Sequence, residues 1–391
     1  MTARFLVTAS SEMQAVAVGW QIYSITHRPL DLGLVGLAQF LPGVLLFLLA
    51  GHAADRFPRR RIIMACYAGF SLCSLVLLAL SVMSVHAIWP IYAVLLGNGV
   101  VRSFNGPASQ SILPSLVAEE HFPNAVAWSS SIFMSATILG PAIGGLLYGI
   151  TNSPAPVYCS AAAGAVIALT LVSRLRLKLP IRPRIAPSKA LILDGLRYIW
   201  RKKLVLGAMS LDLFAVLLGG AVALLPVYAD KILKIGPSGL GLLRSGPGMG
   251  ALLIAVANAY YPLKRHAGAA MLWCVAGFGT FTVVFGLSRI AVLSMAALVL
   301  LGACDMISVI VRSTMVQLAT PDEMRGRVSA VNMVFIGASN EVGQFESGLT
   351  AQWFGTVPAV VLGGLGTVCI VALWTWLFPQ LRKVDELTKV R

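Results

Sequence analysis

Charged side chains inside long apolar stretches are the residues of this chain whose types and positions could do chemistry. Five acids and three arginines lie within such stretches, namely Glu12, Arg102, Asp212, Arg244, Asp305, Arg312, Glu341 and Glu346. A charge in the hydrocarbon core of a bilayer is costly unless it faces a cavity or a partner of opposite charge. Desolvation favours the protonated form of a carboxyl group, so an unmatched acid can bind and release a proton. The candidates for proton coupling are Glu12, Arg102, Asp305 and Glu341.

Helical spacing separates the candidates in the second half of the chain. Asp305 and Arg312 share one helix face, but they lie about 10.5 Å apart along the axis at 1.5 Å per residue. They therefore need a third partner, and the pair could equally be a structural lock formed through a neighbouring helix. Glu341 and Glu346 differ by about 140° around their helix and cannot both face one cavity. We favour Glu341 as the inward-facing acid.

Polar and aromatic side chains near the middle of the apolar stretches are candidates for a substrate cavity. They are Trp20, Gln21, Tyr23, Gln39, Asn105, Arg312, Asn340 and Gln344. A few polar groups in an otherwise apolar pocket are typical of a small-molecule site. The five histidines all lie in loops or at the ends of the stretches, which argues against a metal site within the membrane. Without a catalytic triad, a metalloprotease motif or a phosphate-binding loop, we expect no enzyme and no cofactor.

The elements that must position these residues are membrane-spanning helices. The chain has 391 residues, of which 58% are hydrophobic and only 12% charged. About 20 apolar residues suffice for a helix to cross a bilayer core of roughly 30 Å. Twelve such stretches are predicted at 4–26, 30–50, 62–83, 87–112, 123–150, 155–173, 204–229, 237–262, 268–287, 290–318, 327–352 and 356–378. The sequence thus predicts an all-α membrane protein with twelve transmembrane helices.

One long connection divides the twelve stretches into two groups of six. It runs over residues 174–203, where Pro180, Pro183 and Pro187 interrupt regular structure. Basic and apolar residues then alternate at helical spacing from Lys189 to Lys203, as in an amphipathic helix at a membrane surface. We therefore expect an N-terminal six-helix bundle over 1–173, a cytoplasmic linker over 174–203, a C-terminal six-helix bundle over 204–378 and a cytoplasmic tail over 379–391.

The net charge of +15 follows the expected membrane topology. Four arginines crowd the connection from Gly51 to Arg61, and most other Lys and Arg residues fall on the same side of the predicted spans. Basic residues are retained on the cytoplasmic side, so this connection and both termini are predicted to be cytoplasmic. Attraction to anionic membrane lipids accounts for the charge. No nucleic-acid-binding motif is present, and we expect no nucleic-acid partner.

The connection also carries a family signature. The segment Gly51–Ile63 resembles the loop between helices 2 and 3 of the major facilitator superfamily, G-x-L-A-D-R-x-G-R-R-x-x-L, although Ala53 replaces the usual leucine and Pro58 the usual glycine. The resemblance implies a cytoplasmic gate built from Gly51, Asp55, Arg56, Arg59 and Arg60. For Arg59 and Arg61, a role as topology anchors has equal weight.

Two further segments are similar to patterns of that superfamily. Arg102 and Gly106 fit an R-x-x-x-G pattern in which the family's arginine is implicated in proton transfer. The run Gly140-Pro141-Ala142-Ile143-Gly144-Gly145 resembles the G-P-x-x-G-G motif, which is found mainly in the family's proton antiporters. The resemblance implies an antiporter role for Gly140, Pro141, Gly144 and Gly145. Close helix packing and bending alone could also account for these residues.

The segments Met13–Gln21 and Met324–Val328 are most similar to the enterobactin-exporter-like, or transmembrane secretion effector, branch of the superfamily. This resemblance implies a multi-pass protein of the bacterial inner membrane that exports a drug or siderophore-like molecule. The implied mechanism is proton-coupled antiport by alternating access. The alternative is a nutrient importer or uniporter of the same fold. The expected partners are a small-molecule substrate, protons and membrane lipids, and the expected state is a monomer.

Overall fold

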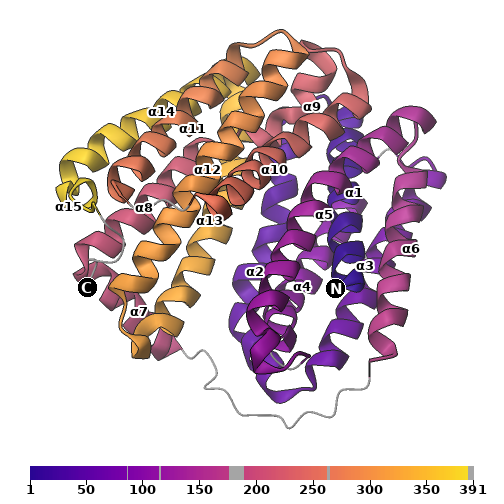
Figure 1. Cartoon of the computed structure of the whole chain (residues 1–391). Helices are drawn as coiled ribbons and strands as arrows, with labels where there is room; N and C mark the ends of the chain where they lie inside the picture. The colour runs from indigo at the N-terminus through magenta and orange to yellow at the C-terminus, as the bar shows by residue number, and fades with distance from the viewer. Residues whose placement is uncertain (86, 114–115, 176–188, 262–264, 386–391) are drawn as a thin grey trace. The chain divides into compact units, whose positions relative to one another are not determined.

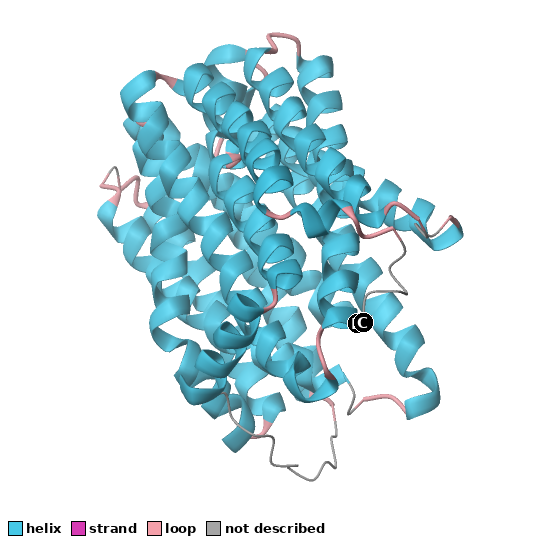
Figure 2. Ribbon diagram, turned by 90° about the vertical axis from the view of Figure 1, so that its left-hand side faces the viewer, coloured by secondary structure: helices cyan, strands magenta, loops and turns pink. Residues whose placement is uncertain are grey.

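The computed structural model describes residues 1–85, 87–113, 116–175, 189–261 and 265–385, apart from a few side chains such as that of Asp55. All regular secondary structure in these ranges is helical, as Figure 2 shows. This confirms the predicted all-α class. The prolines of the linker, Pro180, Pro183 and Pro187, lie outside the described residues.

Within the described ranges, twelve long helical segments occupy the twelve predicted stretches (Figure 1). They are α1 (Thr2–Thr26), α2 (Pro29–Arg56), α3 (Arg59–Val82), α4 (Trp89–Ile112), α5 (Phe122–Thr151), α6 (Ala155–Ser173), the interrupted segment that begins with α8 (Lys203–Leu218), α10 (Gly236–Tyr260), α11 (Ala267–Leu287), α12 (Ala291–Ala319), α13 (Asp322–Phe354) and α14 (Thr356–Leu377). Shorter helices are α7 (Lys189–Arg201), α15 (Pro379–Arg382) and the 3-10 turn η2 (Glu119–His121). The fold is that of a twelve-helix membrane protein.

Nine of these segments are long and apolar enough to cross a membrane when the described residues are judged by length and composition alone. The other three, α1, α4 and α13, are as long but carry Glu12, Arg102 and Glu341. Their polar side chains lower the mean hydropathy of helices that are otherwise built like spans. The helices with the weakest apolar signal are therefore those that carry three of the candidate coupling residues.

The helices pack into two compact units, and each unit includes a short segment from the other half of the chain. Unit 1 comprises Met1–His27, Leu37–Pro187 and Lys234–Ser245, so it includes the first turns of α10. Unit 2 comprises Arg28–Gly36, Ser188–Leu233 and Gly246–Arg391, so it includes the first turns of α2.

Unit 1 is held together by α1, which packs on α5 and α6, and by α3, which packs on α4 and α6. A core of buried side chains forms at the α3 and α6 contact, with Ile63, Phe70 and Ala168 among its members. One buried hydrogen bond joins α1 to α6: the Tyr158 hydroxyl donates to Gln21 Oε1 at 2.6 Å. Such pairing is required because an unsatisfied polar group in a bilayer costs several kcal/mol.

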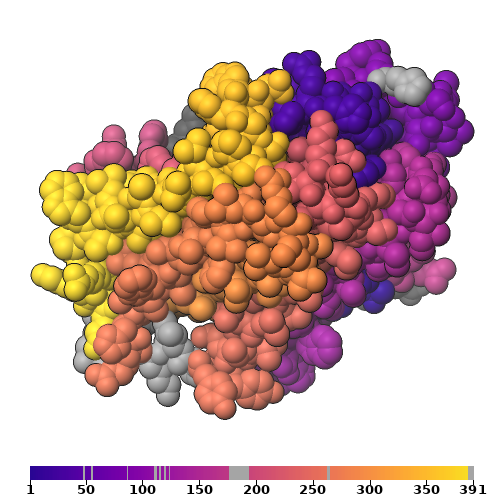
Figure 3. Space-filling view, turned by 90° about the horizontal axis from the view of Figure 1, so that it is seen from above, coloured from indigo at the N-terminus to yellow at the C-terminus, as the bar shows by residue number. Residues whose placement is uncertain are grey.

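Unit 2 is built around α11, which packs on α12 and α14, and around α8, which packs on α13 and α14. Its core contains Met271, Met315 and Trp374. The Trp374 indole donates to Ser210 Oγ at 3.0 Å, so this large side chain is buried with its polar atom satisfied. From above, the yellow C-terminal residues of unit 2 lie beside the orange residues of the preceding helices (Figure 3).

The seventh predicted span, 204–229, is interrupted. Helix α8 stops before Gly219 and Gly220, and the chain continues as η3 (Ala221–Leu224), α9 (Leu225–Val227) and a π-helical turn, η4 (Tyr228–Ile232). A Cβ atom on Gly220 would lie 2.7 Å from the carbonyl oxygen of Gly343, so only glycine allows this approach of α8 to α13. Irregular backbone is tolerated at membrane depth where protein surrounds it.

The predicted cytoplasmic loop over residues 51–61 is mostly helical. Helix α2 continues through Arg56 and α3 begins at Arg59, which leaves only Phe57 and Pro58 between them. Pro58 is the residue that precedes the first turn of α3, and its carbonyl accepts from the amide of Arg61 at 2.8 Å. A proline has no amide of its own to satisfy at this position. Proline in place of the family's glycine therefore sharpens the turn without cost to the helix.

Candidate functional site

An ion pair joins α1 to α10 inside unit 1. Glu12 Oε2 lies 3.9 Å from Arg244 Nε, and both side chains remain about one-third exposed, at 31% and 28%. The next residue of α10, Ser245, donates to the carbonyl of Ile138 in α5 at 2.7 Å. The attraction between the two side chains depends on both carrying their charges. The sequence placed Glu12 among the coupling candidates but left out Arg244.

The glycine-rich run of α5 is the surface on which these helices meet. A Cβ atom on Gly140 would lie 2.7 Å from Glu12 Cβ, and one on Gly144 would lie 2.7 Å from Met13 Cα. A Cβ atom on Gly145 would lie 2.6 Å from the Cα of Gly241 in α10. Gly140 and Gly144, which are four residues apart, therefore face α1, and Gly145, the next residue along, faces α10. Small residues thus bring three backbones together around Glu12.

Replacing Gly145 with alanine is expected to destabilise unit 1 by about 1–3 kcal/mol, because the new methyl group meets backbone that cannot turn aside. Gly106 in α4 is the matched control, since a Cβ atom there has no neighbour within 4 Å among the described residues. Gly106→Ala is expected to be neutral or stabilising. Thermal unfolding of the two purified variants in detergent tests this. Equal midpoints for both would contradict the close contact of α5 with α10.

Arg102 donates a hydrogen bond to an amide side chain, whereas Glu12 pairs with an arginine. Its terminal nitrogen donates to Gln39 Oε1 at 2.8 Å, which links α4 to α2 within unit 1. A hydrogen bond to a neutral amide leaves the guanidinium charge uncompensated by that contact. Two residues that the sequence assigned to different sites, proton coupling and substrate binding, thus lie together.

The residues of the predicted gate lie at the α2–α3 turn. Arg60 donates to the carbonyl of Val172 at 3.2 Å and to that of Ser173, the last residue of α6. A cation at this position satisfies the final carbonyls of α6 and complements its dipole. Arg56 is exposed, Gly51 is half-buried and Arg59 lies in the first turn of α3. The side chain of Asp55 is outside the described part of the chain.

A buried ion pair lies inside unit 2. Arg312 NH1 is 2.6 Å from Asp212 Oδ2, and these side chains are only 5% and 9% exposed. Asp212 and Asp305 line the same small cavity, of about 10 Å³, together with Ser308. That volume is close to the minimum for one water molecule. The carboxylate that pairs with Arg312 is therefore Asp212 on α8, and Asp305 shares a small cavity with that pair.

The polar residues of α13 bond mainly to one another. Gln344 donates from Nε2 to Glu341 Oε2 at 3.1 Å. Glu346 Oε1 accepts from the Thr350 hydroxyl at 2.6 Å. Asn340 donates to the carbonyl of Ile336, four residues earlier, at 2.8 Å. Gly36 of α2 also belongs to unit 2, and a Cβ atom there would lie 3.1 Å from Glu341 Oε2. Glu341 thus lies where α2 meets α13.

The remaining substrate candidates are divided between buried and partly exposed positions. Tyr23 is 2% exposed and its ring stacks edge-on against His27. Trp20 is half-buried, with its ring 6.4 Å from that of Tyr148. Asn105 is also half-buried and accepts from the Ser109 hydroxyl at 3.1 Å. Of these aromatic and amide groups, Trp20 and Asn105 keep surface that a solute can reach.

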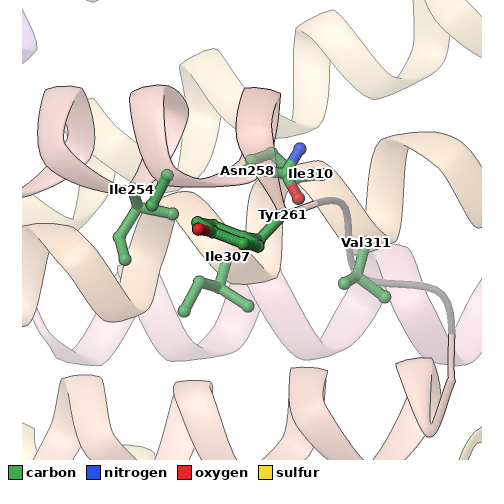
Figure 4. Close-up of a pocket in the computed structure, with 7 residues that line it drawn as sticks. Ile254, Asn258, Tyr261, Ile307, Ile310 and Val311 are labelled. Atoms are coloured by element: carbon green, nitrogen blue, oxygen red, sulfur yellow. The ribbon is translucent and has the colours of Figure 1, made fainter.

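A separate cavity of about 140 Å³ lies in unit 2 between α10 and α12 (Figure 4). Its wall is formed by Ile254, Ala257, Asn258, Tyr261, Ile307, Ile310 and Val311. The wall is mainly aliphatic, and Asn258 contributes its one amide side chain. The substrate candidates selected from the sequence do not line this cavity.

The sequence missed Asp212 and Arg244 as site residues. Both were counted among the charges in apolar stretches but assigned to no site, whereas Asp212 is buried against Arg312 and Arg244 pairs with Glu12. The signal that could have found them is the cost of an unpaired charge in the membrane, which favours a nearby base for an acid that stays ionised. Counting charges identified the imbalance but did not assign the pairs.

Comparison with known proteins identifies the family. A family model described as Transmembrane secretion effector matches residues 2–390. The chain belongs to this family of major facilitator superfamily transporters. The chain is accordingly a multi-pass membrane transporter.

Two bacterial relatives match this chain over nearly its full length. The enterobactin exporter EntS of Shigella boydii serotype 4 (strain Sb227) is 29% identical over 395 residues, covering 98% of this chain and 92% of the relative. The enterobactin exporter EntS of Escherichia coli (strain SMS-3-5 / SECEC) is 28% identical with the same coverage.

Solved structures agree on the fold. The nucleoside transporter NupG superposes with a TM-score of 0.71 at 15% identity, covering 96% of this chain and 97% of NupG. A POT family transporter in complex with 5-aminolevulinic acid gives a TM-score of 0.75 at 12% identity, covering 98% of this chain and 96% of that one. At such low identity, the likeness extends to the fold of this chain and not to its substrate.

Proposed function

We propose that this protein is a proton-driven exporter of a small organic molecule, drug-like or siderophore-like, in the bacterial inner membrane. The observation that carries the proposal is the junction of Glu12, Arg244 and the glycine-rich run of α5. It places a titratable ion pair among helices whose contact depends on close backbone approach. Its relatives are named as exporters, which supports the outward direction.

In this proposal the protein works by alternating access, with residues 1–173 and 204–378 as the moving bodies and both termini cytoplasmic. Protonation of Glu12 weakens its attraction to Arg244 and lets α10 separate from α1 and α5. Loss of the proton restores the pair. Each half has one further residue that takes part in proton coupling. These residues are Arg102, which bonds to Gln39, and Asp305, which shares a cavity with Asp212. The gate residues, from Gly51 to Arg60, act at the cytoplasmic end, and the protein acts as a monomer.

Everted membrane vesicles from an expressing strain test export. With an acidic lumen, we expect the vesicles to accumulate substrate, because protons leaving the lumen drive substrate into it. A first panel would hold enterobactin, chosen because relatives carry that name, and a set of small organic antimicrobials. Vesicles from a strain with empty vector are the control.

Collapsing the pH difference with nigericin separates the mechanisms. Accumulation that persists after collapse would contradict proton coupling. Equal exchange in both directions, without accumulation at any pH difference, would instead indicate a uniporter. Uptake that is driven into right-side-out cells would indicate an importer.

A further inference from the structure

Helix α7 is held against unit 2 by one of its faces. Ile199 is fully buried in a core that also contains Val328 of α13. Asp194 Oδ2 lies 3.3 Å from Arg327 NH1, and the Tyr198 hydroxyl donates to the carbonyl of Ala319 at 2.8 Å. This face is thus fixed by packing, by an ion pair and by a hydrogen bond to the end of α12.

The opposite face of α7 is apolar and exposed. Leu193, Leu196 and Trp200 follow one another at spacings of three and four, so they lie on one side of the helix. Their exposed fractions are 53%, 39% and 72%. A tryptophan and two leucines exposed side by side are costly in water at roughly 25 cal/mol per Å² of apolar surface. This composition is typical of a helix face that is covered by apolar groups.

Positive charge borders the same face. Arg197 and Arg201 lie beside the apolar side chains, and Lys202 and Lys203 follow directly; all four are exposed. Within the described residues, none of the four forms an ion pair, whereas the one acid of α7, Asp194, is engaged on the docked face. The exposed face is therefore apolar at its centre and cationic at its edge.

The position of α7 fixes what this face meets. The helix ends at Arg201 and the membrane span that starts with α8 begins at Lys203, so a single residue separates them. The docked face contacts the first turns of α13, another span, which begins at Asp322. Both attachments lie at the ends of spans, and α7 is therefore held at the level of the lipid headgroups.

We propose that the exposed face of α7 is a binding surface for anionic phospholipids of the surrounding membrane. Leu193, Leu196 and Trp200 enter the boundary between headgroups and acyl chains, where tryptophan is enriched. Arg197, Arg201, Lys202 and Lys203 contact the phosphodiester groups, as juxtamembrane basic clusters do. The proposal is independent of the substrate, direction and coupling of transport.

An anionic lipid fits this face better than an acidic protein segment. The apolar side chains and the charges are displaced from each other around the helix, and this matches the layering of acyl chains beneath headgroups. Continuity with the spans also brings lipid to the face at all times, whereas a protein partner would have to displace that lipid first. Occupied in this way, α7 links the lipid surface to α13 through Asp194 and Arg327.

Quenching of Trp200 fluorescence by brominated lipids tests the proposal. The full chain would be reconstituted in phosphatidylcholine bilayers that contain the same fraction of either brominated phosphatidylglycerol or brominated phosphatidylcholine. The Trp200→Phe variant supplies the signal of the other tryptophans, to be subtracted. We expect Trp200 to be quenched about twofold more strongly by the brominated anionic lipid, with the difference shrinking as salt increases.

A paired variant isolates the charges. Arg197→Gln with Arg201→Gln, which leaves Lys202 and Lys203 in place, is expected to reduce the preference for the anionic lipid while Trp200 remains quenched by both. Arg382→Gln with Lys383→Gln, which alters two exposed basic residues elsewhere in unit 2, is the matched control and should retain it. Circular dichroism verifies that each variant is folded. If a variant does not fold, the salt dependence of quenching in the unmodified chain still tests the proposal.

Three results would overturn the proposal. The first is equal quenching by both lipids in the unmodified chain at every salt concentration. The second is quenching of Trp200 by aqueous iodide but by neither lipid, which would place the face in water. The third is protection of Trp200 from iodide and from both lipids, which would mean that a protein segment covers it.

Discussion

Replacing Arg312 with methionine is expected to prevent the accumulation of folded protein. The substitution leaves the carboxylate of Asp212 buried without the partner that lies 2.6 Å away. Removing one member of a buried ion pair costs about 3–5 kcal/mol, a large part of a total stability of roughly 5–15 kcal/mol. Size-exclusion chromatography in detergent and thermal unfolding would measure the loss. A variant as monodisperse and as heat-stable as the unmodified chain would contradict the expectation.

The double variant Asp212→Asn with Arg312→Met separates charge from shape. It removes both charges, and the loss of stability is expected to be at least half recovered, because a neutral amide is far less costly to bury than an unpaired carboxylate. A double variant as unstable as Arg312→Met alone would mean that the arginine acts through packing of its stem. Transport by the folded double variant then tells whether this pair also takes part in coupling.

The twelve helices could be predicted from the sequence because the membrane imposes a one-dimensional rule. A span must be about 20 residues long and apolar, and its backbone must be satisfied within the helix. The glycine run of α5 could be located in the same way, since small residues allow close helix contacts in lipid. This rule does not predict how each helix is rotated about its own axis. Gly145 meeting Gly241 depends on that rotation and on the path of α10.

The partners of the charged residues required the structure for the same reason. Glu12 pairs with Arg244, more than half the chain away, and Arg102 bonds to Gln39. Each of these contacts depends on which helices are neighbours, and hydropathy is nearly the same for all arrangements. Spacing within one helix showed only that Asp305 and Arg312 needed a third group, and it could not identify Asp212.

Helix ends were the other weak point. The charges from Asp55 to Arg61 were interpreted as a loop because they cannot lie in hydrocarbon, yet a helix can continue into water, as α2 does through Arg56. In the opposite direction, the interruption after α8 lies in an apolar stretch that looked continuous. Two adjacent glycines, Gly219 and Gly220, were the available signal, and their effect depends on α13 approaching from outside.

Replacing Glu12 with glutamine is expected to abolish concentrative transport while leaving exchange intact. Each pH unit across the membrane supplies about 1.36 kcal/mol per coupled proton, enough for about a tenfold substrate gradient. If Glu12 carries that proton, a one-unit difference drives about tenfold accumulation in the unmodified chain and none in Glu12→Gln. Exchange of labelled for unlabelled substrate should persist, because Arg244 remains 28% exposed and water can solvate it after its partner is lost.

The Glu12→Gln measurement uses purified protein in liposomes, an imposed pH difference and whichever substrate the vesicle panel identifies. Glu346→Gln is the matched control, because that carboxylate bonds to Thr350 within its own helix and is expected to have no role in coupling. If Glu12→Gln accumulates as much substrate as the unmodified chain, the coupling proton would have to be carried by Asp305 or Glu341 instead. Loss of both exchange and accumulation would instead show that the pair with Arg244 is needed for the helices to move at all. Only the selective loss of accumulation assigns the proton to Glu12, because a structural role would impair both processes together.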